Sequence, residues 1–325
     1  MRFAPSIYEH AARVVETSPW RASRDADLMA KAHIEAWRLY EHRPIVVGID
    51  IYNLEAEAYG AEVAEPSGNG IPAISRHPFS STRQLLNLAP FDPARDGRVP
   101  MVLGVARRIR QECPHADVRV PLSGPFSLAT NLMGFENLLC EVFADPAAVR
   151  AALEHLVRRQ VEFCRAVAQH GLDIAFFESA AAPPLLSPDQ FRDVELPALV
   201  AIMRQTADVV GHPVPCILGG DTYPILEYIL QTGTGYLCCP VATDQAAFME
   251  KMRTHPEVEV RINMDPRPLI SKNLEDAKKE VDRVVALAQN TRRICIGTGC
   301  LPFETDPDMV IEIKQYIESK NTHTD

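Results

Sequence analysis

The chain opens with two stretches, residues 7–17 and 25–42, whose apolar residues recur every three to four positions. This period predicts two helices ahead of any strand. The pattern then changes to a continuous apolar, β-branched run over Pro44–Ile51, which predicts a buried strand. Turn-forming Pro and Gly residues follow over Glu65–Pro78, so we expect a loop there.

From residue 117 onward, apolar strands alternate with amphipathic helices. The predicted strands cover residues 117–122, 174–177, 214–218, 236–239, 258–263 and 293–297. The predicted helices cover residues 147–170, 188–210, 224–230, 244–253, 273–289 and 307–319. Such alternation forms either a doubly wound parallel sheet or a barrel.

A doubly wound nucleotide fold would place G-x-G-x-x-G after its first strand, and Gly48–Asn53 does not match that motif. With about seven or eight strand–helix units, the pattern favours the α/β class and a single (β/α)8 TIM-type barrel. The 325 residues suit one such barrel and contain no linker or repeat. We therefore expect an N-terminal helical segment, residues 1–43, packed on a barrel formed by residues 44–325.

Polar or thiol groups follow nearly every predicted strand. Barrel enzymes carry their active sites where strands end and loops begin, so these groups are candidate site residues. They are Asp50, Asn53, Glu178, Ser179, Asp221, Cys238, Cys239, Asn263, Asp265 and Cys300.

Several of these residues have a structural alternative. Asp50, Asp221 and Asp265 are also suited to cap the segments that follow them. Cys238 lies in an apolar run, where a cysteine usually behaves as a small core residue. Cys300 is different, because Gly297–Gly299 precede it and place it just past a strand, where we expect it to face a cleft.

Composition narrows the class of protein. Apolar residues make up 46% and charged residues 23% of the chain, which is typical of a globular protein. The net charge of −10 disfavours binding to nucleic acid or to an anionic membrane surface, and no apolar run approaches the ~18 residues of a membrane span. The eight cysteines are scattered and no apolar signal-peptide core is present near Met1, so we expect a cytoplasmic location with reduced thiols.

Five segments, taken in order, resemble the signature motifs of the uroporphyrinogen decarboxylase superfamily. They are Asp50-Ile51 with Glu55–Val63, Gly124–Thr130 (GPFSLAT), Phe177–Ser179 with Leu186–Pro188 and Leu196-Pro197, Asn263–Pro266 (NMDP), and Gly299–Pro302 (GCLP) with Thr305–Pro307. The resemblance covers roughly residues 40–320. It implies a (β/α)8 barrel.

The superfamily contains decarboxylases and corrinoid-dependent methyltransferases. Asp50 and Ser179 match substrate-binding positions of the decarboxylases. Against this, the N-terminal arginine motif of those enzymes is missing, Asn131 stands where they have Tyr, and Gly299 stands where they have His. We therefore expect a methyltransferase. The alternatives are a decarboxylase that uses Asp50 as an electrostatic anchor, and a non-catalytic barrel that binds a corrinoid or tetrapyrrole.

The methyltransferase resemblance implies transfer between a methylcobamide on a partner corrinoid protein and a small thiol or tetrahydrofolate acceptor. Thiol-using members bind Zn²⁺ through H-x-C and the Cys of G-C-x-x-P. Cys300 matches the latter, and Cys216 is the one cysteine near the H-x-C position, so these two are the expected zinc ligands. Catalytic zinc needs about three protein ligands. The third would be one of Glu178, Asp221 and His77.

A folate-using member needs no zinc, because its nitrogen acceptor has only to be oriented and protonated. In either version, Asp50, Glu178 and Asn263 are the expected catalytic residues. The expected substrate-binding residues are Asn53, Ser179, Asp221 and Asn131. Decarboxylase relatives often pair, which leaves a homodimer open.

Overall fold

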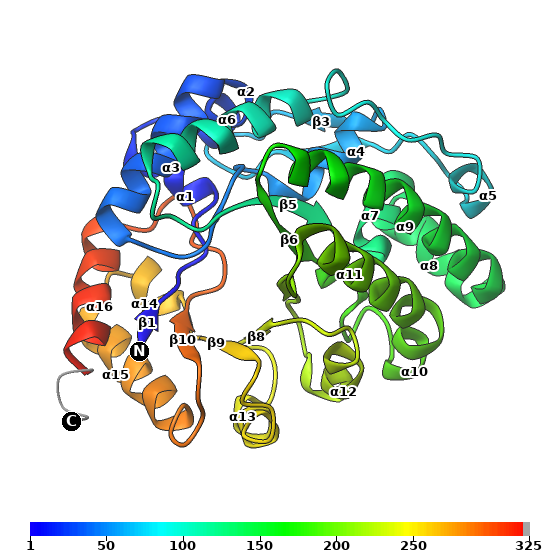
Figure 1. Ribbon diagram of the computed structural model, residues 1–325. Coiled ribbons are helices and arrows are strands. Elements are labelled where there is room, and N and C mark those ends of the chain that lie inside the picture. The colour runs from blue at the N-terminus through cyan, green and yellow to red at the C-terminus, as the bar shows by residue number, and fades with distance from the viewer. Residues whose placement is uncertain (321–325) are drawn as a thin grey trace.

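The computed structural model describes residues 1–320, and within this range eight parallel strands form two four-stranded sheets. The strand orders are β1-β10-β9-β8 and β2-β5-β6-β7. The bounds are β1 (Arg2–Phe3), β2 (Ile45–Val46), β5 (Val118–Ser123), β6 (Asp173–Phe177), β7 (Cys216–Ile217), β8 (Tyr236–Cys239), β9 (Glu259–Asn263) and β10 (Ile294–Gly297). Both sheets curl around one centre with the helices outside them (Figure 1). The fold is therefore a (β/α)8 barrel of the TIM type, as predicted.

Helices cover the outside of the strands. The α-helices are α1 (Glu9–Val14), α2 (Pro19–Arg24), α3 (Ala26–Tyr40), α4 (Leu54–Ala58), α5 (Thr82–Leu85), α6 (Val99–Glu112), α7 (Pro125–Met133), α8 (Phe135–Ala144), α9 (Pro146–Gln169), α10 (Pro188–Gln190), α11 (Leu196–Val210), α12 (Leu226–Leu230), α13 (Gln245–Met252), α14 (Arg267–Ile270), α15 (Leu274–Leu287) and α16 (Pro307–Ser319). Short helical turns are η1 (Ile51–Asn53), η2 (Ser179–Ala181), the π-helical η3 (Phe191–Glu195) and η4 (Tyr223–Ile225).

Local sequence signals explain where the longer helices begin and end. The Asp145 side chain caps α9 by accepting a hydrogen bond from Ala148 N at 3.0 Å, and Pro146 fills the first helical position. Helix α11 ends at Gly211, whose φ of +84° is a left-handed conformation that glycine adopts readily. The expected helix over residues 188–210 is one continuous structure in three parts, α10, η3 and α11.

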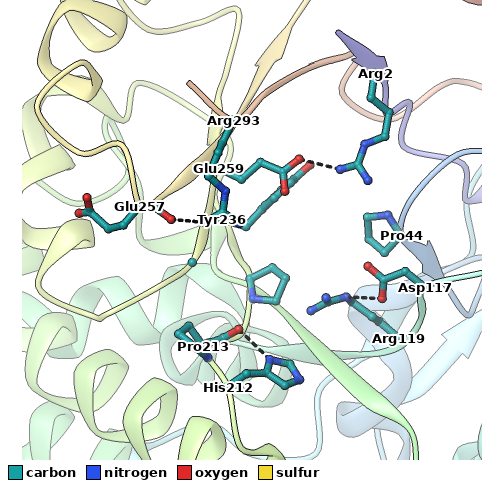
Figure 2. A pocket seen from close by; sticks show the side chains of 12 residues that line it. Arg2, Pro44, Asp117, Arg119, His212, Pro213, Tyr236, Glu257, Glu259 and Arg293 are labelled. Atoms are coloured by element: carbon teal, nitrogen blue, oxygen red, sulfur yellow. Dashed lines mark hydrogen bonds and ion pairs between the residues drawn. The ribbon is translucent and has the colours of Figure 1, made fainter. Parts of the chain in front are cut away.

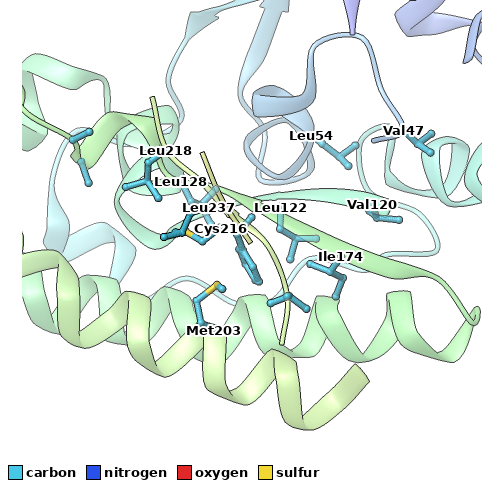
Figure 3. Packing of buried hydrophobic residues seen from close by; sticks show 14 of the residues in the cluster. Val47, Leu54, Val120, Leu122, Leu128, Ile174, Met203, Cys216, Leu218 and Leu237 are labelled. Atoms are coloured by element: carbon cyan, nitrogen blue, oxygen red, sulfur yellow. The ribbon is translucent and has the colours of Figure 1, made fainter. Parts of the chain in front are cut away.

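The barrel has two cores, because alternate residues of each strand face opposite sides. Ala175 and Phe177 of β6 face the lumen, the space enclosed by the strands, whereas Ile174 and Phe176 pack under the helices. Figure 3 shows part of this outer core, between the strands and the helix that carries Met203. The same alternation decides which residues at the strand ends can reach a substrate.

The N-terminal segment departs from the sequence prediction. Residues 1–43 do contain α1, α2 and α3, but they begin with strand β1, which pairs in parallel with β10. Arg2 lies opposite Cys295 and Phe3 opposite Ile296. The expectation of a purely helical segment packed on the barrel is thus corrected: these residues supply one of its strands. A two-residue strand is too short to produce a readable pattern.

The connection between β2 and β5 contains a hairpin that the sequence did not predict. Strands β3 (Glu62–Ala64) and β4 (Ala73–Arg76) pair antiparallel, within the region expected to be a loop. None of the helices in residues 1–320 is both long and apolar enough to cross a lipid bilayer.

Candidate active site

Asp50 and Asn53, which follow β2, belong to a buried ion-pair network. Both oxygens of the Asp50 carboxylate accept from the Arg98 guanidinium, at 2.8 and 2.7 Å. Arg98 also donates to Glu57 at 2.5 Å. The Asn53 amide donates to Asp50 at 3.1 Å and to the Pro72 carbonyl at 2.7 Å. The first two predicted site residues therefore lie together, but their polar atoms are engaged by the protein.

Asn131 also connects protein segments. Its amide donates to the Tyr52 carbonyl at 2.7 Å, and its own carbonyl contacts the His77 ring at 2.8 Å. These two bonds fix the β2 loop against the end of α7. The structure thus gives Asn131 and His77 a positioning contact at the mouth, the carboxyl end of the barrel.

Ser179 and Asp221 lie on neighbouring loops at the mouth and are both half-buried. Ser179 Oγ accepts from Gly219 N at 2.9 Å. Asp221 accepts from the Thr243 hydroxyl at 2.8 Å, and that hydroxyl also accepts from Tyr223 N. The loops after β6, β7 and β8 are therefore joined by hydrogen bonds from these two predicted residues.

Glu178 does not face the lumen, where a catalytic side chain would have to lie. Because Phe177 faces the lumen, the next side chain faces the helices, and Glu178 is fully buried there. Its Oε1 accepts from both the backbone N and the Oγ of Ser127 at 2.8 Å. A Cβ on Gly124 would lie 1.6 Å from Glu178 Oε2, so this site requires glycine. The expected catalytic role of Glu178 is corrected to a structural one behind the sheet.

Burial of this carboxyl has an electrostatic consequence. Desolvation raises the pKa of Glu178 to about 7, and it raises the pKa of the neighbouring, fully buried Glu195 well above its ordinary value. The two carboxyls lie close enough for the charge of Glu178 to raise the pKa of Glu195 further. Two carboxylates so close cannot both be ionised away from water, so the pair holds at least one proton at neutral pH.

The two expected zinc ligands are not brought together. Cys216 precedes the lumen-facing Ile217, and it is fully buried in the outer core, as Figure 3 shows. Cys300 instead lies at the mouth and is exposed. Within residues 1–320, no three His, Cys, Asp or Glu side chains are close enough to hold a metal ion. These residues do not fit a zinc site, and the expectation for Cys216 and Cys300 is corrected.

The lumen beneath the mouth is lined by aromatic residues, thiols and one cation. The rings of Tyr8 and Tyr52 pack edge-on against Phe177, with centroids 6.0 and 5.7 Å away. Strand β9 directs Arg261 and Asn263 inward, since Val260 and Ile262, which alternate with them, pack under the helices. Asn263 is thus the one expected catalytic residue that faces the lumen.

Sequence reasoning missed Tyr8, Tyr52 and Arg261. A signal for Arg261 was present, because Glu259, Arg261 and Asn263 alternate with apolar residues at a period of two. Tyr8 follows the unrecognised strand β1, so its place at the mouth had no visible signal.

Glu9 is a further residue near the mouth. Glu9 begins helix α1, and the segment just before it pairs with the Cys300 loop through a bridge between Ser6 and Cys300. Burial raises the pKa of Glu9 to about 7, and one of its carboxylate oxygens has no hydrogen-bond partner in the described part of the chain. Surrounding protein raises the pKa of Cys300 to about 12, although its side chain remains accessible. Glu9 is therefore the carboxyl near the mouth best suited to exchange a proton at neutral pH.

A pocket of about 340 Å³ lies at the opposite end of the barrel, where the strands begin (Figure 2). Its charged residues are paired within the protein: Arg2 with Glu259 at 2.6 Å, and Arg119 with Asp117 at 2.8 Å. In TIM barrels this end contributes to stability and the carboxyl end holds the active site. We therefore place the candidate site at the mouth.

Comparisons with known proteins agree with this fold. A family model described as uroporphyrinogen decarboxylase (URO-D) matches residues 1–319. A solved methyltransferase structure from Methanosarcina mazei superposes with a TM-score of 0.80 at 21% identity, covering 98% of this chain and 93% of that one. A B12-independent methionine synthase from a Shewanella species superposes with a TM-score of 0.58 at 10% identity, covering 91% and 87%.

Two curated proteins are similar over part of their sequences. A methylated-thiol–coenzyme M methyltransferase of Methanosarcina mazei is 29% identical over 139 residues, which are 42% of this chain and 37% of the relative. The methylcobamide:CoM methyltransferase MtaA of Methanosarcina barkeri is 25% identical over 173 residues, which are 53% and 50%. The matched regions thus span half or less of the length of these relatives.

Proposed function

Because the chain belongs to the uroporphyrinogen decarboxylase (URO-D) family, we propose that it is a corrinoid-dependent methyltransferase of that family. In this proposal a methyl group passes between a corrinoid held on a partner protein and a small thiol or tetrahydrofolate acceptor. The names of the two curated relatives support methyl transfer, and one of them includes methylcobamide. We also keep a cytoplasmic location and a homodimer as predictions.

The observation that carries the proposal is a set of exposed apolar side chains on segments that follow barrel strands, which we call the apolar rim. Large exposed apolar residues are few in this protein, and most of them lie on connections that follow a barrel strand. The apolar rim consists of Ile71, Leu185, Tyr223, Val241 and Ile270. Exposed apolar surface of this kind marks protein–protein contacts. A partner that delivers a bulky cofactor to the lumen has to dock at this rim.

The lumen residues then have distinct tasks. Asn263 has a buried side-chain oxygen without a hydrogen-bond partner in residues 1–320, so this oxygen is free to accept a hydrogen bond from the molecule that receives the methyl group. Glu9 takes up or returns the proton of the acceptor near Cys300. Asp50 acts as a positioning residue, because its bonds to Arg98 hold the β2 loop. The methyl-transfer chemistry belongs to the corrinoid, and the barrel supplies placement.

This version of the reaction contains no zinc-dependent step, because the cysteines do not form a metal site. The decarboxylase alternative is also less well supported. It needs the Asp50 carboxylate as an anchor for substrate, and both oxygens of that carboxylate are already bound by Arg98.

The test is a methyl-transfer assay with free methylcobalamin and, separately, 2-mercaptoethanol or tetrahydrofolate. We expect loss of the methylcobalamin absorbance to require both the protein and one of the acceptors. Asn263→Ala is expected to slow the reaction while leaving the fold intact. Absence of turnover with either acceptor, together with carbon dioxide release from uroporphyrinogen, would replace this proposal by the decarboxylase.

A further inference from the structure

Arg261 lies inside the barrel lumen, in the middle of β9. Its side chain is only 4% exposed. The aliphatic part crosses directly over Gly297 of β10, where an added Cβ would come within 2.4 Å of Arg261 Cδ. Glycine at this position therefore makes room for the arginine, so the sequence of two strands is adapted to it.

Arg261 forms no ion pair with another side chain of residues 1–320. Its guanidinium contacts the Cys238 thiol, and Tyr236, Tyr8 and Cys295 also lie near it. Burial raises the pKa of Cys238 and brings that of Cys295 to about 11, so both thiols are uncharged at neutral pH. Across residues 1–320 no carboxylate forms an ion pair with Arg261, and its Nε has no hydrogen-bond partner.

A buried guanidinium without an anion is unfavourable, because neither water nor a carboxylate compensates its lost hydration. Arg98, which is half-buried, is by contrast paired with both Asp50 and Glu57. Arg261 lies two residues before Asn263, where β9 ends, and active sites of this fold lie at that end of the strands. Its position therefore points to a ligand that brings the missing negative charge.

The residues above Arg261 indicate how such a ligand would lie. Asn263 is the next lumen-facing residue of the same strand toward the mouth, and its Oδ1 is buried and unpartnered in the described chain. Cys300 and Tyr52 are close enough to be influenced by the charge of Arg261. The free polar groups thus run from Arg261 in the depth of the lumen, past Asn263, to Cys300 at the mouth.

We propose that Arg261 binds the carboxylate of a small organic substrate, whose other end points past Asn263 toward the mouth. A planar guanidinium offers two parallel N–H groups to a carboxylate, which gives both affinity and orientation. The identification of this molecule as the methyl acceptor or methylated product rests on the proposed function. The binding of the carboxylate does not.

The test compares an acid with its uncharged amide on the complete chain, by isothermal titration calorimetry in low-chloride buffer. The probes are 3-(methylthio)propanoate and 3-(methylthio)propanamide. We expect the acid to bind the wild-type protein at least about tenfold more tightly than the amide, since a charge-assisted pair is worth at least one such factor. In Arg261→Gln this preference should fall to within about twofold.

Arg2→Gln is the matched control, because it removes a guanidinium from the opposite end of the same barrel, where Arg2 pairs with Glu259. It should keep the preference for the acid. Equal binding of acid and amide to the wild type, or no binding of the acid at millimolar concentration, would overturn the proposal. So would a preference that survives in Arg261→Gln. The wild-type comparison can overturn the proposal by itself, even where a variant fails to fold.

Failure of the proposed function gives a different result. Calorimetry uses no corrinoid, so carboxylate binding without methyl transfer would keep the role of Arg261 and remove the methyltransferase. Methyl transfer without a preference for the acid would keep the methyltransferase and remove the role of Arg261.

Discussion

Glu178 and Glu195 form a carboxyl pair behind the sheet, out of reach of water. Backbone and hydroxyl donors of Ser127 satisfy one oxygen of Glu178, while the other oxygen of Glu178 and both oxygens of Glu195 have no hydrogen-bond partner in residues 1–320. The same donors that begin α7 therefore fix the end of β6. Such a pair is neutral or singly charged in the folded chain and doubly charged in the unfolded chain at neutral pH.

The pair should make stability depend on pH. Both carboxyls have raised pKa values in the folded protein, so the folded chain keeps protons that the unfolded chain loses as the pH rises above about 4.5. Their contribution is present below that pH and is lost as the pH rises through the folded-state pKa values, which are about 7 for Glu178 and well above the ordinary value for Glu195. Glu195→Gln removes one titration. We expect its stability relative to wild type, measured by urea unfolding, to increase by up to ~1.4 kcal/mol per pH unit over this window.

Glu154→Gln on the exposed face of α9 is the control for this experiment, because that carboxyl is in water in both states. Its difference from wild type should stay constant with pH. Parallel pH curves for Glu195→Gln and wild type would contradict the account of the buried pair.

Gly124→Ala tests the packing of the same site. The new methyl group would overlap the Glu178 carboxylate, because the Cβ position lies 1.6 Å from Oε2. We expect a loss of about 1–3 kcal/mol or more in the free energy of unfolding. Gly104→Ala, in the open interior of α6, should instead gain about 0.5–1 kcal/mol. Equal effects of the two changes in urea unfolding would refute this reading.

At the scale of elements, neighbouring residues of a barrel strand face opposite sides, so a shift of one residue moves a side chain from the lumen to the outer core. Phe177 faces inward and Glu178 outward, and the same holds for Ile217 and Cys216. Both faces of such strands are apolar, so the sequence contains no alternation from which to read the facing. This explains why the expected roles of Glu178 and Cys216 were wrong, although their strands were predicted within one or two residues.

Other features were visible from sequence. The strand over 236–239 was predicted with its observed bounds, and Asn263 was placed correctly at a strand end. Arg261 stands in an alternating strand, so its inward position could have been predicted. The lack of an ion pair at Arg261 could not be predicted, because it depends on residues from two other strands, β8 and β10, and from the segment after β1. The network around Asp50 likewise joins distant segments through Arg98.

Strand β1 contributes to stability as part of the barrel rather than as an appendage. Phe3 is buried in the outer core. We expect Phe3→Ala to cost about 3–5 kcal/mol, as for other buried Phe residues, and to lower the stability of the whole barrel in one cooperative transition. Leu39→Ala, at a side chain that is 40% exposed, should cost much less. Selective loss of helix α1–α3 signals in hydrogen exchange, with the rest unchanged, would show that residues 1–43 unfold separately.

At the scale of the whole molecule, the two ends of the barrel differ in character. The amino end carries paired charges in the pocket of Figure 2, whereas the carboxyl end carries the apolar rim. A docked partner would therefore cover the mouth and leave the amino end free. This arrangement also removes water from around Arg261 and Asn263, which strengthens every polar contact there.

Charges on the apolar rim should therefore weaken partner docking without altering the lumen. The double change Leu185→Asp and Tyr223→Asp is expected to raise the KM for a methylated corrinoid protein about tenfold or more. Turnover with free methylcobalamin should be unaffected. Phe143→Asp is the control, because Phe143 is 75% exposed but lies on α8 in the outer layer. An equal effect of Phe143→Asp would mean that the apolar rim is not the docking surface.

The pairing of β1 with β10 also governs the order in which this protein can mature on the ribosome. Arg2 is made long before its partner Cys295, because the other barrel strands lie between them in the sequence. Strand β1 must therefore wait, with its hydrogen-bonding groups unused, until β10 has been made. Folding dominated by such distant contacts is slow and exposes unpaired strand edges, so this chain depends on protection during its translation more than a domain closed by local pairing would.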